Sequence, residues 1–196
     1  MHCPFNNKNC KKKNQKIFLD LGKLPRVDVL LSKQDLKKKE TTKPLKIYFC
    51  KKCFLVQHPA YTDPKDIFVD DYIYYSSTVS SWVEHCQEFV NQSIKRFSLS
   101  QKSFVIEVAS NDGYLLQNFV KKNIPCLGVE PSTGVIKEAK KKGVKTINDF
   151  YNLASSKKII KSYPRADLII ANNVLAHIPN LKDFIESSLL LLKEDG

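Results

Sequence analysis

The sequence predicts an α/β protein, in which a parallel doubly wound sheet follows a small cysteine-rich module. Between residues 101 and 196, short apolar runs alternate with amphipathic segments, a pattern typical of parallel strands joined by crossover helices. Four of the six cysteines fall within the first 53 residues, where helical periodicity is weak. We therefore expect three parts: a cysteine module over 1–60, an aromatic loop with a connecting helix over 61–100, and four strands of the sheet over 101–196.

The connecting helix is predicted from apolar residues at helical spacing. Ser81 and Glu84 have the spacing of a capping box and predict its start. The inward-facing residues are Val79, Trp82, Val83, Cys86, Phe89, Val90, Ile94 and Phe97.

Four strands are predicted at 104–109, 126–130, 144–147 and 166–171. The first is an almost continuous apolar run, as expected of a strand buried on both faces of a parallel sheet. Four helices are expected to follow the strands. The first begins at Asp112–Gly113 and turns Leu115, Leu116, Phe119 and Val120 inward; the second is capped by Ser132 or Thr133 and ends at Gly143. The third begins near Leu153, and the fourth runs from its cap Asn180 through Leu192.

The charge of the chain is strongly positive, at +12, but it decides little about function. The excess is mostly lysine, in scattered runs such as Lys37–Lys39 and Lys140–Lys142, whereas a reader of phosphates or bases favours arginine. Two interpretations remain open: a solvated lysine-rich surface, or an anion-binding face that suits a diphosphate-bearing substrate. We expect no nucleic acid as partner.

Neither a membrane span nor a signal peptide is predicted. No run approaches 18 uninterrupted apolar residues, and the start of the sequence lacks the apolar core of a signal peptide. We therefore expect a cytoplasmic protein that does not bind membranes.

The clustered cysteines predict a zinc site. Cys50 and Cys53 form a C-x2-C pair, a spacing that lets two thiolates reach one tetrahedral zinc. Cys3 and Cys10 are the candidates to complete it, and four protein ligands would make the zinc structural, with no position open for water. Cys86 and Cys126 stand alone in apolar patterns and are interpreted as core residues.

A candidate nucleoside site lies where the first two strands end. The segment Glu107–Gly113, EVASNDG, makes a tight turn into a helix, without the GxGxxG pattern of dinucleotide-binding folds. Glu130 ends the second strand, where a carboxylate can accept hydrogen bonds from two ribose hydroxyls; the alternative is a charge favoured by a helix N-terminus. After the fourth strand, Asn172 and Asn173 either reach the same site or simply cap the strand.

Several segments together resemble the zinc-containing, S-adenosylmethionine-dependent C-methyltransferases that act on nucleotide-linked deoxysugars. The resemblance rests on five segments, which follow one another along the chain in the same order as in that family. They are IFLDLGKLP, YFCKKCFLVQH, DYIYYSSTVSSWVEHC, VIEVASNDGYLLQNFV and ADLIIANNVLAHIPNLKDF. It implies a class I methyltransferase fold with S-adenosylmethionine over 111–113. The implied cofactor-binding residues are Glu107, Ala109, Ser110, Asn111, Asp112, Gly113, Glu130, Pro131, Asp149, Phe150, Asn172 and Asn173.

The resemblance also bears on the zinc ligands. The family has a second cysteine close to the first, where this chain has Asn6, but Cys10 stands where that second cysteine is expected relative to Phe18. We interpret this as an insertion that keeps a four-cysteine site. A degraded site, assisted by His2 or without metal, is the alternative.

The resemblance assigns the substrate to the aromatic loop and leaves the catalytic base unassigned. The implied substrate-binding residues are Tyr72, Tyr74, Tyr75, Ser76 and Ser77, although the rings could instead be packing. The family attributes proton removal to a segment expected beyond Gly196, so the chain alone is not expected to methylate; nearby candidates are Tyr74, His85 and His177. The alternative function is a non-catalytic module that binds zinc and S-adenosylmethionine and works with a second chain that completes the sheet.

Overall fold

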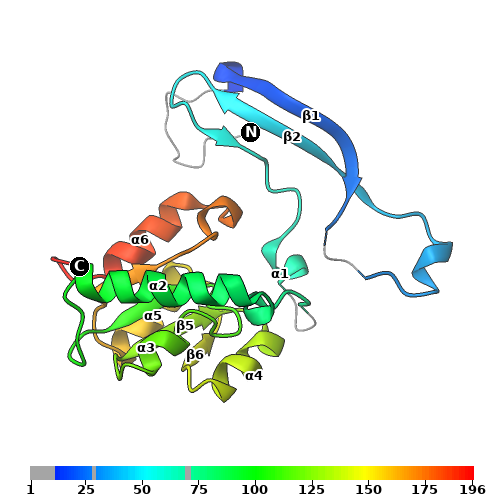
Figure 1. Cartoon of the computed structure of the whole chain (residues 1–196). Helices are drawn as coiled ribbons and strands as arrows, with labels where there is room; N and C mark the ends of the chain where they lie inside the picture. The colour runs from blue at the N-terminus through cyan, green and yellow to red at the C-terminus, as the bar shows by residue number, and fades with distance from the viewer. Residues whose placement is uncertain (1–11, 28–29, 69–71) are drawn as a thin grey trace. The chain divides into compact units, whose positions relative to one another are not determined.

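A computed structural model describes residues 12–27, 30–68 and 72–196 of this chain (Figure 1). The chain divides into two compact units, residues 1–67 and 68–196. The predicted zinc ligands Cys3 and Cys10, with His2 and Asn6, lie outside the described residues.

The first unit is built on a three-stranded antiparallel sheet in the order β1-β2-β3. The long pair β1 and β2 can be followed in Figure 1. Gln15 lies opposite Cys50, so the start of β1 adjoins the cysteine pair. The elements are η1 (Lys12–Asn14), β1 (Gln15–Pro25), η2 (Asp35–Lys37), β2 (Thr42–Cys50), β3 (Val56–Gln57) and α1 (Pro64–Ile67).

The second unit contains the predicted helix and the predicted parallel sheet. Its elements are η3 (Ser76–Thr78), α2 (Ser80–Arg96), β4 (Val105–Val108), α3 (Gln117–Val120), β5 (Cys126–Glu130), α4 (Thr133–Lys141), β6 (Thr146–Asn148), α5 (Leu153–Ser162), β7 (Leu168–Ile170), η4 (Leu175–His177) and α6 (Leu181–Leu191). The strand order is β6-β5-β4-β7, with every pair parallel. This confirms the doubly wound sheet and places the fourth predicted strand beside the first.

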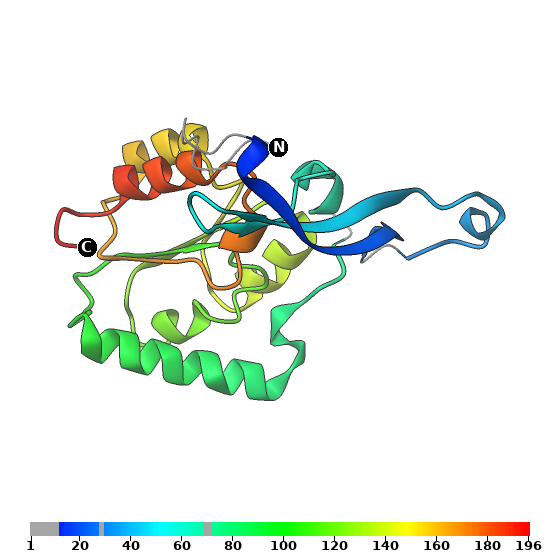
Figure 2. The same cartoon turned by 90° about the horizontal axis from the view of Figure 1, so that it is seen from above.

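Helices cover both faces of the parallel sheet. Figure 2 shows α2 and α3 on one face and α5 and α6 on the other. Along β4 the side chains alternate between two cores: Val105 packs with Cys86 and Phe119, whereas Ile106 packs with Ile159. Strands this apolar on both faces fit only inside such a sandwich, which explains the continuous apolar run in the sequence.

Two predicted details of the helix starts are wrong, and a third is confirmed in its position only. The capping box at Ser81 and Glu84 does not form, because α2 begins at Ser80 with Val79 as its N-cap and has no side-chain cap. Ser132 is the N-cap of α4, as predicted, although its side chain makes no capping hydrogen bond. The chain from Asn111 to Leu116 runs through turns, so the regular part of the next helix, α3, starts only at Gln117.

The predicted start of α6 and the predicted end of α4 are confirmed. Asn180 caps α6, where its Oδ1 accepts a hydrogen bond from the Asp183 N–H at 3.2 Å. Gly143 follows α4 with φ +77°, the left-handed conformation common after helices. Of the helices that the structure describes, none combines the length and hydrophobicity required to span a bilayer.

Candidate functional site

In the turn after β4 the sign of the backbone angle φ alternates, a feature that the sequence does not predict. Ala109, Asn111 and Gly113 all have positive φ, at 53°, 48° and 74°. Glycine usually occupies such positions because it carries no Cβ, and here an Ala and an Asn take two of the three. The N–H groups at these three positions are bonded within the fold, to the Val129 carbonyl, to Glu130 Oε2 and to the Ser110 carbonyl, so the alternation fixes the shape of the turn. We call residues 109–113, where the resemblance places the cofactor, the cofactor turn.

Helix α4 packs closely against the cofactor turn at Gly113. A Cβ placed there would lie 3.0 Å from Val144 Cγ2 and 3.2 Å from both the Cα and the Cβ of Ala139. Glycine is therefore required at 113 for two reasons, the backbone conformation and the lack of space. This contact fixes the end of α4 against the turn.

Glu130 links the end of β5 to the cofactor turn. Its Oε2 accepts the Asn111 backbone N–H at 3.0 Å, and its Oε1 accepts the Ser132 N–H at 2.9 Å. The side chain is buried, and burial raises the pKa of its carboxyl, although the two backbone hydrogen bonds oppose this shift. Asn148, at the end of β6, donates to the carbonyls of Glu130 and Pro131 at 3.2 and 2.7 Å. Strand ends and turn thus form one hydrogen-bonded rim.

The aromatic loop, residues 72–78, lies directly on the cofactor turn. The Asn111 Oδ1 accepts the Ser76 N–H at 2.9 Å, and its Nδ2 donates to the Tyr74 carbonyl at 3.0 Å. Two segments that the sequence assigns to different ligands are therefore joined by one side-chain amide. Tyr74 itself keeps 56% of its surface exposed, so its ring remains accessible.

A second connection between loop and turn involves Lys142, which in the sequence is simply the last residue of a lysine run. Asp112 Oδ2 accepts hydrogen bonds from the Ser77 N–H at 3.3 Å, from the Ser77 hydroxyl, and from Lys142 Nζ at 2.9 Å. Lys142 Nζ also donates to the Asp112 carbonyl at 2.8 Å and to Ser77 Oγ at 3.1 Å. Helical spacing from Val135 and Ala139, both buried in α4, was the signal that could have identified Lys142.

Glu107 lies behind the cofactor turn, buried among apolar residues. Burial raises the pKa of its carboxyl well above the usual range; a hydrogen bond with Tyr114 works against this, while Glu130 and Asp112 add to it. Its Oε2 has no hydrogen-bond partner among the described residues. Burial and the nearby Glu107 also raise the pKa of Cys86 to about 11 and of Cys126 to about 12, in keeping with the predicted core role of these thiols.

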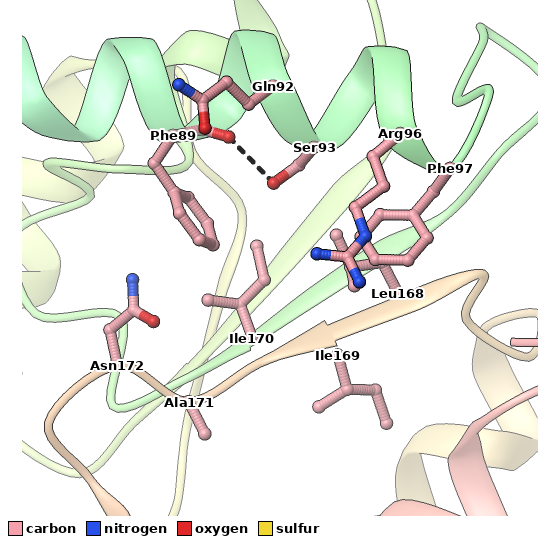
Figure 3. Close-up of a pocket in the computed structure, with 10 residues that line it drawn as sticks. All are labelled: Phe89, Gln92, Ser93, Arg96, Phe97, Leu168, Ile169, Ile170, Ala171 and Asn172. Atoms are coloured by element: carbon pink, nitrogen blue, oxygen red, sulfur yellow. Dashed lines mark hydrogen bonds between the residues drawn. The ribbon is translucent and has the colours of Figure 1, made fainter.

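The other predicted cofactor residues lie on neighbouring loops. Asp149 Oδ1 accepts the Phe150 N–H at 2.9 Å, and the Phe150 carbonyl accepts the Ser155 hydroxyl at 2.7 Å, so both belong to the start of α5. Asn173, with φ 55°, and Asn172 follow β7. Asn172 lines a groove of about 320 Å³ between α2 and β7, opposite Phe89 (Figure 3). None of these four bonds directly to the cofactor turn in the part of the chain that is described.

The three candidate bases are not brought together. His85 is exposed on α2 and stacks on Trp82 at 5.2 Å between ring centroids. Trp82 in turn stacks on Tyr114 at 6.1 Å. His177 is exposed in η4, and Tyr74 lies in the aromatic loop. No acid–base pair is formed from them in the described structure.

The cysteine pair adopts a tight knuckle. The Phe54 N–H donates to the Cys50 carbonyl at 2.8 Å, and the Cys50 N–H donates to the Leu55 carbonyl at 2.9 Å. Phe54 has φ 61°, a conformation that costs a non-glycine residue roughly 1–2 kcal/mol. Cys50 is buried, with Cys53 packed against it. Among the described residues no group of three metal-ligating side chains occurs, and the predicted ligands Cys3 and Cys10 lie outside them.

The residues of the turn fit an adenosine-type cofactor. Glu130 accepts one backbone hydrogen bond on each oxygen, which leaves a further lone pair on each for a ribose hydroxyl. Asp112 Oδ1 is buried and has no partner among the described residues, so it can accept from a cationic group. Gly113 allows a ligand to approach the backbone closely.

Two family models match the chain. Residues 82–196 match a model described as "Methyltransferase domain", and residues 8–68 match one described as "Putative zinc binding domain". The C-methyltransferase NovU of Streptomyces niveus is 27% identical over 178 residues, which are 91% of this chain and 42% of NovU. The chain thus spans less than half the length of that relative.

Two of the similar solved structures share 20% and 15% of their sequence with this chain. A S-adenosylmethionine-dependent methyltransferase from Clostridium acetobutylicum covers 61% of this chain and 49% of its own at TM-score 0.48 and 20% identity. DesVI from Streptomyces venezuelae covers 69% and 55% at TM-score 0.47 and 15% identity.

The sheet order, the turn after its first strand and the acidic end of its second strand are those expected of a class I S-adenosylmethionine-dependent methyltransferase fold. The methyltransferase model covers more than half of the sequence. The chain belongs to the methyltransferase domain family.

Proposed function

We propose that the chain binds S-adenosylmethionine on the cofactor turn and serves the C-methylation of a nucleotide-linked deoxysugar. The observation that carries the proposal is the Glu130 carboxylate, held between the Asn111 and Ser132 N–H groups at the end of β5. A carboxylate in this place has the acceptors that two ribose hydroxyls need. The sugar substrate is supported by the sequence resemblance, and carbon as the methyl acceptor also by the similarity to NovU, a C-methyltransferase.

The residues around the turn would divide the work of binding. Glu130 would accept from the ribose, Asp112 Oδ1 would face the cationic methionine end, and Asp149 and Phe150 would flank the adenine. The cofactor, when bound, supplies an electrophilic methyl group. The exposed ring of Tyr74, held over the turn by Asn111, would meet the sugar and orient its acceptor carbon.

For the first unit we propose one structural zinc on Cys50, Cys53, Cys3 and Cys10. Support comes from the knuckle geometry at Phe54 and from the zinc-binding family model over 8–68. Four cysteine ligands leave no open coordination position, so the zinc would stabilise the unit and take no part in methyl transfer.

A second candidate function is a module that binds the cofactor and works with a partner chain. The observation in its favour is β7, whose residues Leu168–Ile170 pair with β4 alone in the described structure, although Ala166 just before it forms a parallel bridge with Leu192; β7 also borders the groove of Figure 3. An unpaired apolar edge invites association with another strand. Under this proposal the chain should self-associate as its concentration rises, which sedimentation velocity would detect; a stable monomer at high concentration would contradict it.

Calorimetric titration of the chain with S-adenosylhomocysteine tests the main proposal. We expect saturable binding at one site, with NAD and ATP, which share the adenosine but lack the amino-acid end, bound at least tenfold more weakly. Equal affinity for all three would contradict a methionine-specific site. A chain that binds none of them, while its circular dichroism shows a folded α/β protein, would contradict the cofactor proposal itself.

A further inference from the structure

We infer that Lys142 is a positioning residue, which fastens the aromatic loop to the cofactor turn through the carboxylate of Asp112. What the site binds rests on the proposed function, but the fastening itself is a property of the chain and can be measured without ligand. The contacts join residue 77, residue 112 and residue 142, which come from three separate elements of the second unit.

The ammonium group of Lys142 has all its hydrogen-bonding capacity used at this point. It donates to the Asp112 carbonyl, to Asp112 Oδ2 and to Ser77 Oγ, at 2.8, 2.9 and 3.1 Å, and an ammonium has three N–H groups. The side chain of Asp112 is only 2% exposed and that of Lys142 is 23% exposed. Removal of the ammonium would leave a buried carboxylate without its counter-charge, which is costly.

Helical spacing on α4 places Lys142, and not its neighbour Lys141, next to Asp112. Val135 and Ala139 are the buried residues of α4, and Lys142 follows on the same side, three residues after Ala139. Ala139 is the residue that leaves no space for a Cβ at Gly113. Lys141, by contrast, is exposed and pairs with Glu138 at 2.6 Å. The packing that fixes α4 against the turn therefore also sets the position of the Lys142 ammonium.

The consequence is a coupling between the two halves of the site. Ser77, which bonds to Lys142 and Asp112, lies shortly before the start of α2. Its neighbours Tyr74 and Ser76 are bonded to Asn111. Loss of the Lys142 contacts leaves the loop held by the Asn111 amide and by the hydrogen bonds from Ser77 to Asp112, whose carboxylate then lacks its counter-charge. The aromatic loop should then open more often. The cofactor turn should also bind the cofactor less well, because the Asp112 carboxylate has lost its positively charged partner.

Hydrogen exchange of the segment 72–82 in the full chain tests the inference. We compare the wild type with Lys142→Met, Lys142→Arg and the matched control Lys141→Met, which removes an exposed charge from the same helix. We expect about tenfold faster exchange at Ser76 and Ser77 in Lys142→Met, and rates close to the wild type in the other two. S-adenosylhomocysteine affinity should fall about fivefold in Lys142→Met and be restored by Lys142→Arg.

The outcomes separate this inference from the proposed function. Wild-type exchange rates in a folded Lys142→Met variant would overturn the positioning role, whatever the chain binds. Faster exchange in Lys142→Met, in a chain that does not bind S-adenosylhomocysteine, would support the fastening and contradict the proposed function. Should Lys142→Met not fold, Ser77→Ala removes only the hydroxyl partner: about threefold faster exchange at Ser76 supports the inference, and unchanged exchange overturns it.

Discussion

The backbone N–H of Asn111 donates to Glu130 Oε2 at 3.0 Å, so the carboxylate that we propose for the ribose also holds the turn that we propose for the methionine end. A single side chain therefore has two roles, one in the fold and one in binding. A substitution at Glu130 should affect both stability and affinity.

Glu130→Gln should show both effects. One carboxylate oxygen becomes an NH2 donor that faces a backbone N–H, so one buried donor loses its acceptor, at a cost of about 1–3 kcal/mol in the free energy of unfolding. Affinity for S-adenosylhomocysteine should fall about tenfold or more, because a charge-assisted hydrogen bond to the ribose is lost. Urea denaturation and calorimetry measure the two effects. Glu138→Gln, at a half-buried residue of α4, is the control, and equal affinity in Glu130→Gln and wild type would contradict the ribose role.

Gly113→Ala should destabilise the second unit more than Gly143→Ala. Both glycines have positive φ, at 74° and 77°, so both substitutions incur a backbone cost of roughly 1–2 kcal/mol. Only at 113 would the new Cβ lie 3.0 Å from Val144 Cγ2; at 143 the nearest atom is 3.4 Å away. Thermal unfolding should therefore show about 1–3 kcal/mol of additional loss at 113 from overpacking. Equal losses would mean that α4 is not packed against the turn as described.

Glu107→Gln should make the chain more stable relative to the wild type as the pH rises. Burial raises the pKa of Glu107 above its ordinary value of 4.5, so between that value and the raised pKa the folded state holds a proton that the unfolded state has lost. Wild-type stability falls with pH across this window, by at most about 1.4 kcal/mol per pH unit for one group. Glutamine cannot titrate, so the difference between the variants should grow with pH and then level off.

Urea denaturation at a series of pH values measures this difference. Glu84→Gln removes an exposed carboxyl of α2 and controls for the change in net charge. A difference between Glu107→Gln and the wild type that is independent of pH would show that Glu107 titrates as it does in the unfolded chain.

Cys50→Ser should abolish zinc binding, whereas Cys86→Ser should not. We expect about one zinc per wild-type chain by elemental analysis, because four thiolates complete a tetrahedral site. Cys50 is buried at the knuckle of the first unit, whereas the raised pKa of Cys86, about 11, keeps that thiol protonated in the core of the second. Loss of the metal should unfold the first unit and leave the second largely intact. A folded wild type, purified without chelator, that contains less than about a tenth of a zinc would contradict the zinc proposal.

Much of the fold follows from sequence patterns, because burial on both sides of a parallel strand leaves a direct mark on composition. The run before Ala109 and the strand ending at Glu130 are visible in this way, and so is the helix around Cys86. The position of Glu130 could be predicted as well, since it depends only on the end of a strand. These features arise from local patterns.

The remaining features of the site depend on contacts between distant residues. Left-handed φ at Ala109 is invisible in the sequence, because alanine rarely adopts it. The contact that accompanies it is non-local: the Ala109 N–H donates to the Val129 carbonyl of β5 at 2.8 Å. Lys142 differs from Lys141 only in the direction in which it leaves the helix. The aromatic loop meets the turn through backbone groups of Tyr74 and Ser76, and backbone groups carry no sequence signal.

The bonds between the aromatic loop and the cofactor turn all lie within the second unit, which begins at Phe68. A genetic crossover between the codons of Ile67 and Phe68 would therefore transfer loop and turn together and leave this part of the site whole. A crossover only some ten codons later would separate partners that must match, such as Ser77 and Asp112. Recombination that exchanges the N-terminal module is thus compatible with the site, and the loop and the turn are expected to be inherited as one block.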